Sequence, residues 1–529
     1  MKIKKILYLS ILIAIIARFI GLNYAPPHLS NDEIGAAYTA YSISKTNKDG
    51  YSERLPLLWQ SHGGYGSPAA IYAPIASILF FGNNDFAVRL PSAVLGSLTI
   101  IFIGLLVNQI TNNKFLALVT SFVLAVSPWH FLASRSALES NYALFFIVLG
   151  LYLFFLSLEK NKYWVILFSA ISFAISIYSY YTEWVLTPLI IVSLMFLYKK
   201  VISKTKVYYL AIVLIGLLLI PLFINFIQNL SSSRASSEFI TKDIGVGRLL
   251  SQTSNSFTKI QIVFKAIFDK YSSYNSFDYL FFTGAKILPK GNPYQFGFFL
   301  TPFLITFIYG LFKLKNNYKE NTTFVYLLLL LSPIVAATTE GDLNNWRSLP
   351  QLLPVALIVA SGVVSFWEDI ENNFLMKFLF ASSLVVSFFY FFFIFFRHFP
   401  LQRSVDYQYG YKQMSLFINL HYDDYQKFII DQRFGDKNYY YVGVPSSYIP
   451  FYTKTDPIKV QNAVYLTNGI AFDKYEFRNI NWNGENIQKG FLYIIPYDII
   501  PNTKDNLKLI NQIKLPDWRP AFNMYSLED

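Results

Sequence analysis

The chain has 529 residues, of which 54% are hydrophobic and only 14% are charged. A soluble domain carries about 25% charged residues, so this composition excludes an ordinary soluble protein and predicts several membrane spans. Cysteine is absent, which excludes disulfides, thiolate zinc sites and cysteine nucleophiles. The net charge of +12 could indicate a nucleic-acid-binding protein. In a membrane protein, however, the excess of Lys and Arg must first be compared with the positive charge that cytoplasmic loops normally carry.

The apolar runs predict a mainly α, polytopic membrane protein. A spanning helix needs about 20 mostly apolar residues, and eleven runs are read as spans. They are residues 5–22, 91–110, 115–132, 141–158, 163–180, 184–198, 207–226, 296–312, 323–338, 349–367 and 377–396. The first run leads directly into further spans without a small-residue cleavage site, so we predict a retained helix.

The lysines predict which loops face the cytoplasm. With a cytoplasmic N-terminus, the inside loops hold Lys114, Lys160, Lys162, Lys199, Lys200, Lys204, Lys206, Lys313, Lys315 and Lys319. The short outside loops then hold little more than Arg135 and Arg347. A further apolar run at 67–82 would reverse this pattern if it crossed the membrane, so we predict that it lies at the interface or dips into the membrane without crossing it. The positive excess therefore sets the orientation in a cell membrane, and no nucleic-acid partner is expected.

We predict two domains. Residues 1–397 form the transmembrane domain, with outer loops at 23–90 and 227–295, and residues 398–529 form a small extracytoplasmic α/β domain. Alternating runs at 439–444 and 491–495 are typical of short strands. A serine-rich stretch predicts that a mobile loop begins after the seventh span; its serines are Ser231, Ser232, Ser233, Ser236 and Ser237.

Two adjacent carboxylates, Asp32 and Glu33, follow the first span by about ten residues. One interpretation is that Asn31 and Asp32 cap a helix that begins at Glu33, because a capping side chain satisfies free backbone amides. The other is that one carboxylate acts as a general base or a metal ligand in a cavity open to the outer leaflet. The two interpretations can share residues, and both stay open.

Arg135 and Glu139 lie between the third and fourth predicted spans. Residues four apart share a helix face, so they can form an interfacial ion pair that anchors the fourth span. Charged residues beside long apolar helices can also mark a substrate path. Tyr181 and Glu183 lie at the outer end of the fifth span, where aromatic residues usually form an interfacial belt, but both are also candidates for binding the substrate.

Arg347 lies beside Trp346 in a tight outside loop. A guanidinium binds phosphate oxygens in a fork, so Arg347 is a candidate for holding a lipid phosphate. The alternative is an ordinary loop with a snorkelling arginine.

The sequence lacks the motifs of zinc sites and of nucleotide-binding sites. The five histidines, His28, His62, His130, His398 and His421, lack the ligand spacing of a zinc site. No phosphate-binding loop or dinucleotide motif is visible, so direct use of nucleotide sugars or ATP is not indicated.

Several motifs together resemble a known class. They are Asp32-Glu33, Phe80-Phe81-Gly82, Ala87-Val88-Arg89-Leu90-Pro91-Ser92-Ala93, Ser127-Pro128-Trp129 and Ser134-Arg135-Ser136-Ala137-Leu138-Glu139. The pattern resembles the lipid-dependent glycosyltransferases of the GT-C class. Within it, the chain is most similar to the bacterial and archaeal relatives of protein O-mannosyltransferase and aminoarabinose transferase, glycosyltransferase family 39. The resemblance is firmest over residues 1–200.

The resemblance implies a membrane enzyme that transfers one hexose or pentose from a polyprenyl-phosphate donor to a protein, lipid or glycan acceptor on the outer face. By position, the catalytic acidic pair is Asp32 with Glu33. Glu139 falls on the second acidic position and Arg135 on the arginine of the same stretch, and Arg347 falls near the lipid phosphate. Relatives often have Lys before the Pro that opens the interfacial helix.

Where relatives often have this Lys before the Pro, the present chain has Gly66-Ser67-Pro68. The contact that the Lys would make with the lipid phosphate is therefore missing or comes from another residue, with Arg54 as a candidate.

The chemistry of such a donor implies a single inverting displacement. Asp32 would deprotonate the acceptor, and Arg347 would stabilise the departing phosphate. No organic cofactor is indicated, but Asp32, Glu33 and Glu139 could share a divalent metal ion. The alternatives are an oligosaccharyltransferase or glycan polymerase of similar architecture, and a transporter or flippase of a lipid-linked sugar. Because the charges gather at the outer ends of the spans rather than at mid-membrane, they favour an interfacial enzyme.

Overall fold

The computed structural model describes most of the chain. The described residues are 2–61, 64–159, 162–228, 238–285, 296–317, 321–370, 373–436, 439–482, 485–499 and 507–527. His62, Lys160, Lys319 and the serine-rich start of the predicted mobile loop lie outside them. The chain forms two compact units, which are described separately. Unit 1 comprises Met1–Ile20, Ser67–Ala69 and Ser92–Ile394, and unit 2 comprises Gly21–Gly66, Ala70–Pro91 and Phe395–Asp529.

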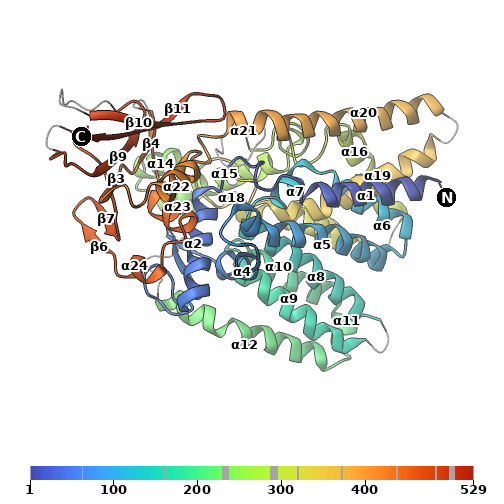
Figure 1. Cartoon of the computed structure of the whole chain (residues 1–529). Helices are drawn as coiled ribbons and strands as arrows, with labels where there is room; N and C mark the ends of the chain where they lie inside the picture. Colours follow the sequence, from blue (N-terminus) through green and yellow to red (C-terminus); the bar gives the residue numbers. More distant parts are fainter. Residues whose placement is uncertain are drawn as a thin grey trace. The chain divides into compact units, whose positions relative to one another are not determined.

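Unit 1 is helical (Figure 1). Its helices are α1 (Lys2–Ala17), most of α5 (Asp85–Thr111), α6 (Lys114–Ala125), α7 (Pro128–Ala133), α8 (Glu139–Ser157), α9 (Ile166–Ser179), α10 (Glu183–Leu197), α11 (Lys199–Ile202), α12 (Val207–Gln228), α14 (Ile244–Ser251), α15 (Ser256–Tyr274), α16 (Phe303–Asn317), α17 (Thr322–Leu331), α18 (Ile334–Ala337), α19 (Leu352–Asp369) and α20 (Phe374–Phe393). The mainly α, multi-pass character predicted from composition is confirmed.

Five helices within the described residues are long and apolar enough to span a membrane. They are Asp85–Thr111, Glu139–Ser157, Val207–Asn225, Leu349–Asp369 and Phe374–Gln402. Other predicted spans are shorter or interrupted: the run at 115–132 divides into α6 and α7 before Pro128, and the run at 323–338 divides into α17 and α18 at Pro333. Proline lacks the backbone donor that a continuous helix needs, so the count of eleven spans stays a prediction.

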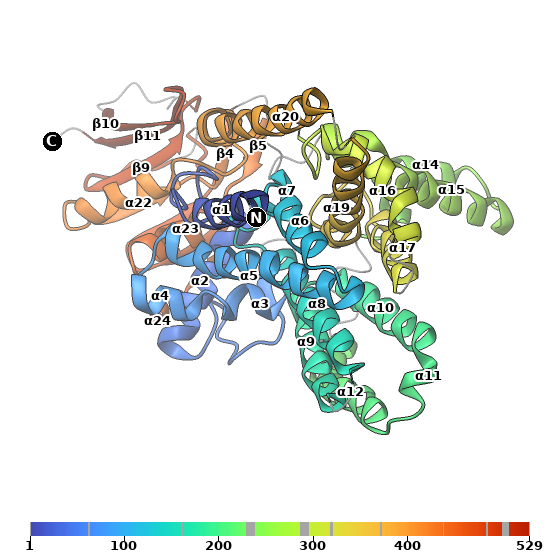
Figure 2. The same cartoon turned by 90° about the vertical axis from the view of Figure 1, so that its right-hand side faces the viewer.

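Close helix contacts hold unit 1 together. In α16 and α19, a side chain at Gly310 would place its Cβ 1.9 Å from the Ile358 carbonyl oxygen. At Gly362 it would lie 1.7 Å from that of Thr306. Such small residues let two membrane helices approach at backbone distance, and Figure 2 shows α16 beside α19. By contrast, only 17% of the apolar stretches of α12 and α20 is buried, as expected of lipid-facing helices.

The predicted second outer loop contains an amphipathic helix, α15. Its exposed apolar side chains, Phe257, Ile260, Phe264 and Phe268, recur at helical spacing and form one face. Tyr271 near its end donates a hydrogen bond to the Leu330 carbonyl at the end of α17. A helix with such a face is suited to lie in the lipid–water boundary.

Unit 2 combines first-loop elements with the C-terminal sheet. It contains α2 (Asn31–Thr46), the hairpin β1 (Trp59–Ser61) and β2 (Gly64–Gly66), and α4 (Ile75–Phe81). The predicted interfacial run at 67–82 is two short helices, α3 (Pro68–Tyr72) and α4, and it exposes Phe80 and Phe81. Neither helix is long enough to cross a membrane.

The tail forms a seven-stranded sheet in the order β10-β11-β9-β3-β8-β7-β6. The strands are β3 (Lys427–Ile430), β6 (Val464–Leu466), β7 (Gly469–Phe472), β8 (Tyr475–Arg478), β9 (Phe491–Pro496), β10 (Leu507–Lys514) and β11 (Pro520–Leu527), and β4 (Arg433–Asp436) pairs with β5 (Tyr439–Val442). Strand β3 is parallel to both its neighbours, β8 and β9. The predicted strand runs at 439–444 and 491–495 correspond to β5 and β9, so the small C-terminal α/β fold is confirmed.

Among the described residues of the tail, the helices are α21 (Phe399–Gln402), α22 (Tyr411–Leu420), α23 (Pro445–Tyr452) and α24 (Pro457–Gln461). Helix α2 packs against α23 and α24 (Figure 1). The first-loop helix that carries the acidic pair therefore shares its core with the C-terminal segment.

Candidate active site

The acidic pair lies in the first turn of α2, which begins at Asn31. The Glu33 amide donates to Ser30 Oγ at 3.4 Å, and the Ser30 amide donates to the Glu33 carboxylate at 2.8 Å. This reciprocal capping box satisfies two backbone donors at once, so the N-cap is Ser30, and the prediction that Asn31 and Asp32 cap the helix is wrong. Asp32, in the same turn, is half-buried.

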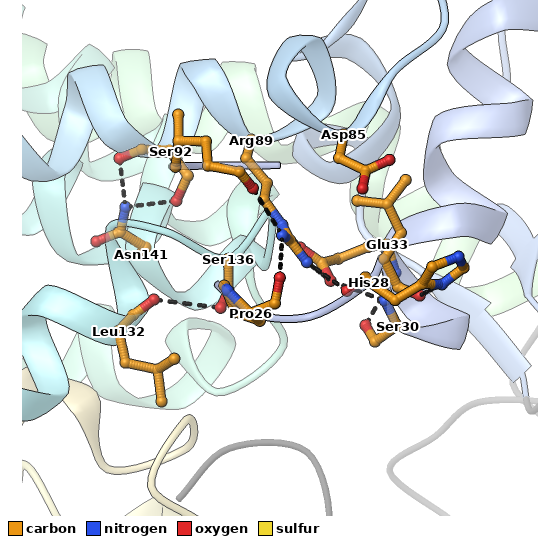
Figure 3. Close-up of polar contacts among 12 residues, drawn as sticks. Pro26, His28, Ser30, Glu33, Asp85, Arg89, Ser92, Leu132, Ser136 and Asn141 are labelled. Atoms are coloured by element: carbon orange, nitrogen blue, oxygen red, sulfur yellow. Dashed lines mark hydrogen bonds and ion pairs between the residues drawn. The ribbon is translucent and has the colours of Figure 1, made fainter. Parts of the chain in front are cut away.

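A buried arginine, Arg89, donates hydrogen bonds to both carboxylate oxygens of Glu33. Arg89 Nε lies 3.0 Å from Glu33 Oε1, and Arg89 Nη2 donates to Oε2 at 3.2 Å; the two side chains are at most 1% exposed. Figure 3 shows the Arg89 guanidinium pointing from α5 to Glu33 and to the backbone before α2. It donates there to the carbonyls of Leu22, Pro26 and His28.

The Glu33–Arg89 pair is bidentate, and bidentate arginine–carboxylate pairs are among the strongest charge-assisted hydrogen bonds in proteins. Because Arg89 occupies both oxygens of Glu33, Asp32 is the better candidate base of the two.

Arg89 belongs to the motif Ala87–Ala93, but no role for it was predicted from the sequence. The signal was available, because Arg89 is a lone charge four residues after Asp85 at the start of a long apolar run. A charge in that position is costly unless it has a partner.

Asp85 forms a second buried cluster in unit 2. It accepts hydrogen bonds from Tyr452 OH at 2.6 Å and from Lys412 Nζ at 3.1 Å, and it is 1% exposed. His28 is also buried, and burial lowers its pKa to about 4, so its imidazole is neutral at physiological pH. Its Nε2 accepts a hydrogen bond from the Lys412 amide.

In unit 1, Arg135 binds the end of the first predicted span. Its Nη1 donates to the carbonyls of Ala17, Arg18 and Ile20 at 2.9, 3.1 and 2.7 Å, and the residue is 0% exposed. Ala17 is the last residue of α1, so its carbonyl has no helical partner, and Arg18 and Ile20 directly follow the helix. The geometry therefore gives Arg135 an anchoring contact with α1, and Glu139 begins α8.

Arg347 donates to a carboxylate of the predicted second outer loop, with its Nη2 2.8 Å from Glu238 Oε2. The two side chains are 17% and 33% exposed. Lys270 of α15 donates to the carbonyl of Thr339, at the start of the loop that carries Arg347. Burial, and secondarily Arg347, lower the Lys270 pKa to about 8. Lys270 is thus a second cation of the predicted outer loops, and the sequence analysis did not name it as a candidate.

The remaining predicted residues are more scattered. Glu183 is buried at the start of α10 and accepts from Thr187 Oγ1, and Tyr181 packs against Trp184. Arg54 is exposed, and its backbone pairs with that of Lys48 in an isolated antiparallel β-bridge, beyond the C-terminal end of α2. A 16-residue helix is about 24 Å long, so the structure does not bring Arg54 to Asp32.

Ser67, at the position where relatives often have lysine, donates its hydroxyl to the Ser179 carbonyl at 2.6 Å.

The described residues contain no group of three or more His, Asp or Glu side chains that could hold a metal ion. The Arg89 contacts also occupy Glu33, one of the three carboxylates predicted as ligands. Metal dependence stays an open prediction.

The comparisons with known proteins agree with this architecture. A family model described as Dolichyl-phosphate-mannose-protein mannosyltransferase matches residues 66–224. Comparison with curated protein sequences finds no match. Among solved structures, the chain is similar to ArnT from Cupriavidus metallidurans in the apo state, with 10% identity and a TM-score of 0.57 over 99% of this chain and 98% of that one.

It is also similar to ArnT from Cupriavidus metallidurans bound to undecaprenyl phosphate, with 10% identity and a TM-score of 0.56 over 98% and 97% of the two chains. At this identity the likeness establishes the fold, which extends over nearly the whole chain. The protein is therefore a multi-pass membrane protein with the fold of ArnT from Cupriavidus metallidurans.

Proposed function

We propose that this protein transfers a monosaccharide from a polyprenyl-phosphate donor to an acceptor on the extracytoplasmic face, with inversion at the anomeric carbon. The observation that carries the proposal is the half-buried Asp32 beside the fixed Glu33–Arg89 pair in the first turn of α2. The GT-C fold and the partial family match support the reaction class. The undecaprenyl phosphate bound to ArnT supports a polyprenyl lipid as donor.

The reaction assigned to this site needs one base. Asp32 accepts the proton of the acceptor hydroxyl as that oxygen bonds to the anomeric carbon. The bond from this carbon to the phosphate oxygen breaks at the same time, and polyprenyl phosphate departs with the bonding electron pair. Glu33, held by Arg89 and by the Ser30 amide, keeps the first turn of α2 in place while the proton moves.

The outer-loop cations are the proposed contacts of the donor phosphate. Arg347 supplies a planar donor fork that matches phosphate oxygens, and Lys270 adds a second positive charge nearby in the same unit. The Arg347–Glu238 pair holds the guanidinium in a defined geometry.

Replacing Arg347 by Gln should raise the KM for the lipid donor about 10- to 100-fold with a smaller effect on kcat. A hydrogen bond to a charged group contributes about 1.5–3 kcal/mol. The measurement is initial-rate kinetics in proteoliposomes. Arg248→Gln, which removes an exposed arginine from α14, is the matched control and should leave KM unchanged. An unaltered KM in Arg347→Gln would remove the phosphate role.

The proposal also places the N-terminus in the cytoplasm and the C-terminal domain outside. Because the chain lacks cysteine, single cysteines report sidedness without background. Ser203, after α11, and Asp269, on α15, are both exposed. An impermeant thiol reagent added to intact cells should label Asp269→Cys, and it should label Ser203→Cys only after the membrane is opened. The reverse pattern would contradict the orientation.

The test of the function is transfer by purified protein in proteoliposomes. Labelled polyprenyl-phosphate monosaccharide should donate its sugar to peptide, lipid or glycan acceptors drawn from the host envelope. A lipid diphosphate oligosaccharide offered in parallel should not be used. Use of the oligosaccharide alone would support the oligosaccharyltransferase or polymerase alternative, and movement of lipid between leaflets without transfer would support a flippase.

A further inference from the structure

Two side chains of the C-terminal segment hold the buried carboxylate of Asp85. Lys412 of α22 and Tyr452 at the end of α23 each bind one of its oxygens, at 3.1 and 2.6 Å. Asp85 precedes them in the chain by 327 and 367 residues. A buried carboxylate is costly without such partners, so these contacts tie the C-terminal segment to the residue that begins α5.

Asp85 and Arg89 are four residues apart, which is about one turn of α5. The segment that holds Asp85 therefore holds the turn from which Arg89 reaches Glu33. Displacing this turn would move the guanidinium away from both oxygens of Glu33.

The same segment also holds the backbone that leads into α2. The Lys412 amide donates to His28 Nε2 at 3.2 Å, and Tyr448 OH donates to the Leu29 carbonyl. His28 Nδ1 binds the same Leu29 carbonyl, which requires the neutral tautomer with its proton on Nδ1. Both partners of the Glu33–Arg89 pair are thus held from α22 and α23.

We propose that Lys412 and Tyr452 are positioning residues, and that the C-terminal segment keeps the first turn of α2, with Asp32, in its working geometry. This inference rests on the proposed function. Misplacing a catalytic group by about 1 Å can cost about 10²-fold in rate, so a distant contact of this kind is expected to act on kcat.

Kinetics of four variants test the inference. Lys412→Met should lower kcat about 10- to 100-fold and leave the KM for the lipid donor within about twofold. Tyr452→Phe, which removes one hydroxyl, should lower kcat in the same way but less. Lys412→Arg keeps the charge beside Asp85 and should recover most of the rate. Lys427→Met is the matched control, because it breaks the Lys427–Glu476 pair inside the sheet and should leave kcat unchanged.

Hydrogen exchange gives a readout that does not depend on activity. In Lys412→Met and Tyr452→Phe, the amides in the first turns of α2 and α5 should exchange faster than in the wild type. Those amides should be unchanged in Lys427→Met. If Lys412→Met does not fold, Tyr452→Phe carries both measurements.

The outcomes separate the two proposals. If the wild type transfers no sugar, the proposed function fails, and the exchange rates alone decide whether the segment holds these turns. Unchanged exchange in the variants would overturn the inference. It would also be overturned if exchange rose while kcat stayed constant, or if Lys427→Met lowered kcat as much as Lys412→Met.

Discussion

Replacing Asp32 by Asn is expected to abolish sugar transfer, with a loss of about 10²- to 10⁴-fold or more in kcat. A positioned general base contributes about that factor, and the amide of Asn cannot accept the acceptor proton. The substitution keeps the size and shape of the side chain, and Ser30 and Glu33 still cap α2. Expression and thermal stability should therefore stay close to those of the wild type, which distinguishes a chemical loss from misfolding.

The matched control for Asp32→Asn is Glu53→Gln. Glu53 is an exposed carboxylate of the same first-loop region, so its loss also removes one negative charge. Rates are measured as transfer of labelled sugar from a polyprenyl-phosphate donor in proteoliposomes. Turnover retained by Asp32→Asn would refute the assignment of Asp32 as the base. Equal losses in the two variants would attribute the effect to charge in the loop rather than to one proton acceptor.

Breaking the buried Glu33–Arg89 pair is expected to have the largest effect on stability. Arg89→Met leaves the Glu33 carboxylate buried without its charged partner, and such a loss costs about 3–5 kcal/mol. Glu33→Gln leaves the Arg89 charge unbalanced, although Gln can still complete the capping box. The double variant should be more stable than the sum of the two single losses predicts, by about 1–3 kcal/mol, because its two neutral groups replace the pair.

The measurement is thermal or denaturant unfolding of the detergent-solubilised protein, applied to both single variants and the double variant. Arg519→Met is the control, because the Arg519–Asp517 pair is exposed at the tail surface and should contribute at most about 1 kcal/mol. If Arg89→Met costs no more than Arg519→Met, the buried pair does not organise the site.

The predicted elements show where reasoning from the residues succeeds. Apolar composition and run length predicted a mainly helical membrane protein, and alternation predicted β5 and β9 in the tail. These signals are local: a lipid-facing or core-facing segment must carry its apolar residues at the period of its own backbone. Local signals were weaker at boundaries, where Pro128 and Pro333 divide predicted spans and Ser30 takes the cap assigned to Asn31 and Asp32.

In the candidate site, too, local features can be predicted from the residues, whereas contacts between distant segments cannot. Asp32 and Glu33 lie together in the predicted first outer loop whatever the fold, because residues that are adjacent in the chain need no folding to meet. Tertiary folding brings Arg89 to Glu33 across 56 residues, Arg135 to the end of α1, and Lys412 to Asp85. A charged side chain can leave water only where the folded chain brings a partner within hydrogen-bond distance. That partner is set by packing between distant segments, so spacing along the chain does not reveal it.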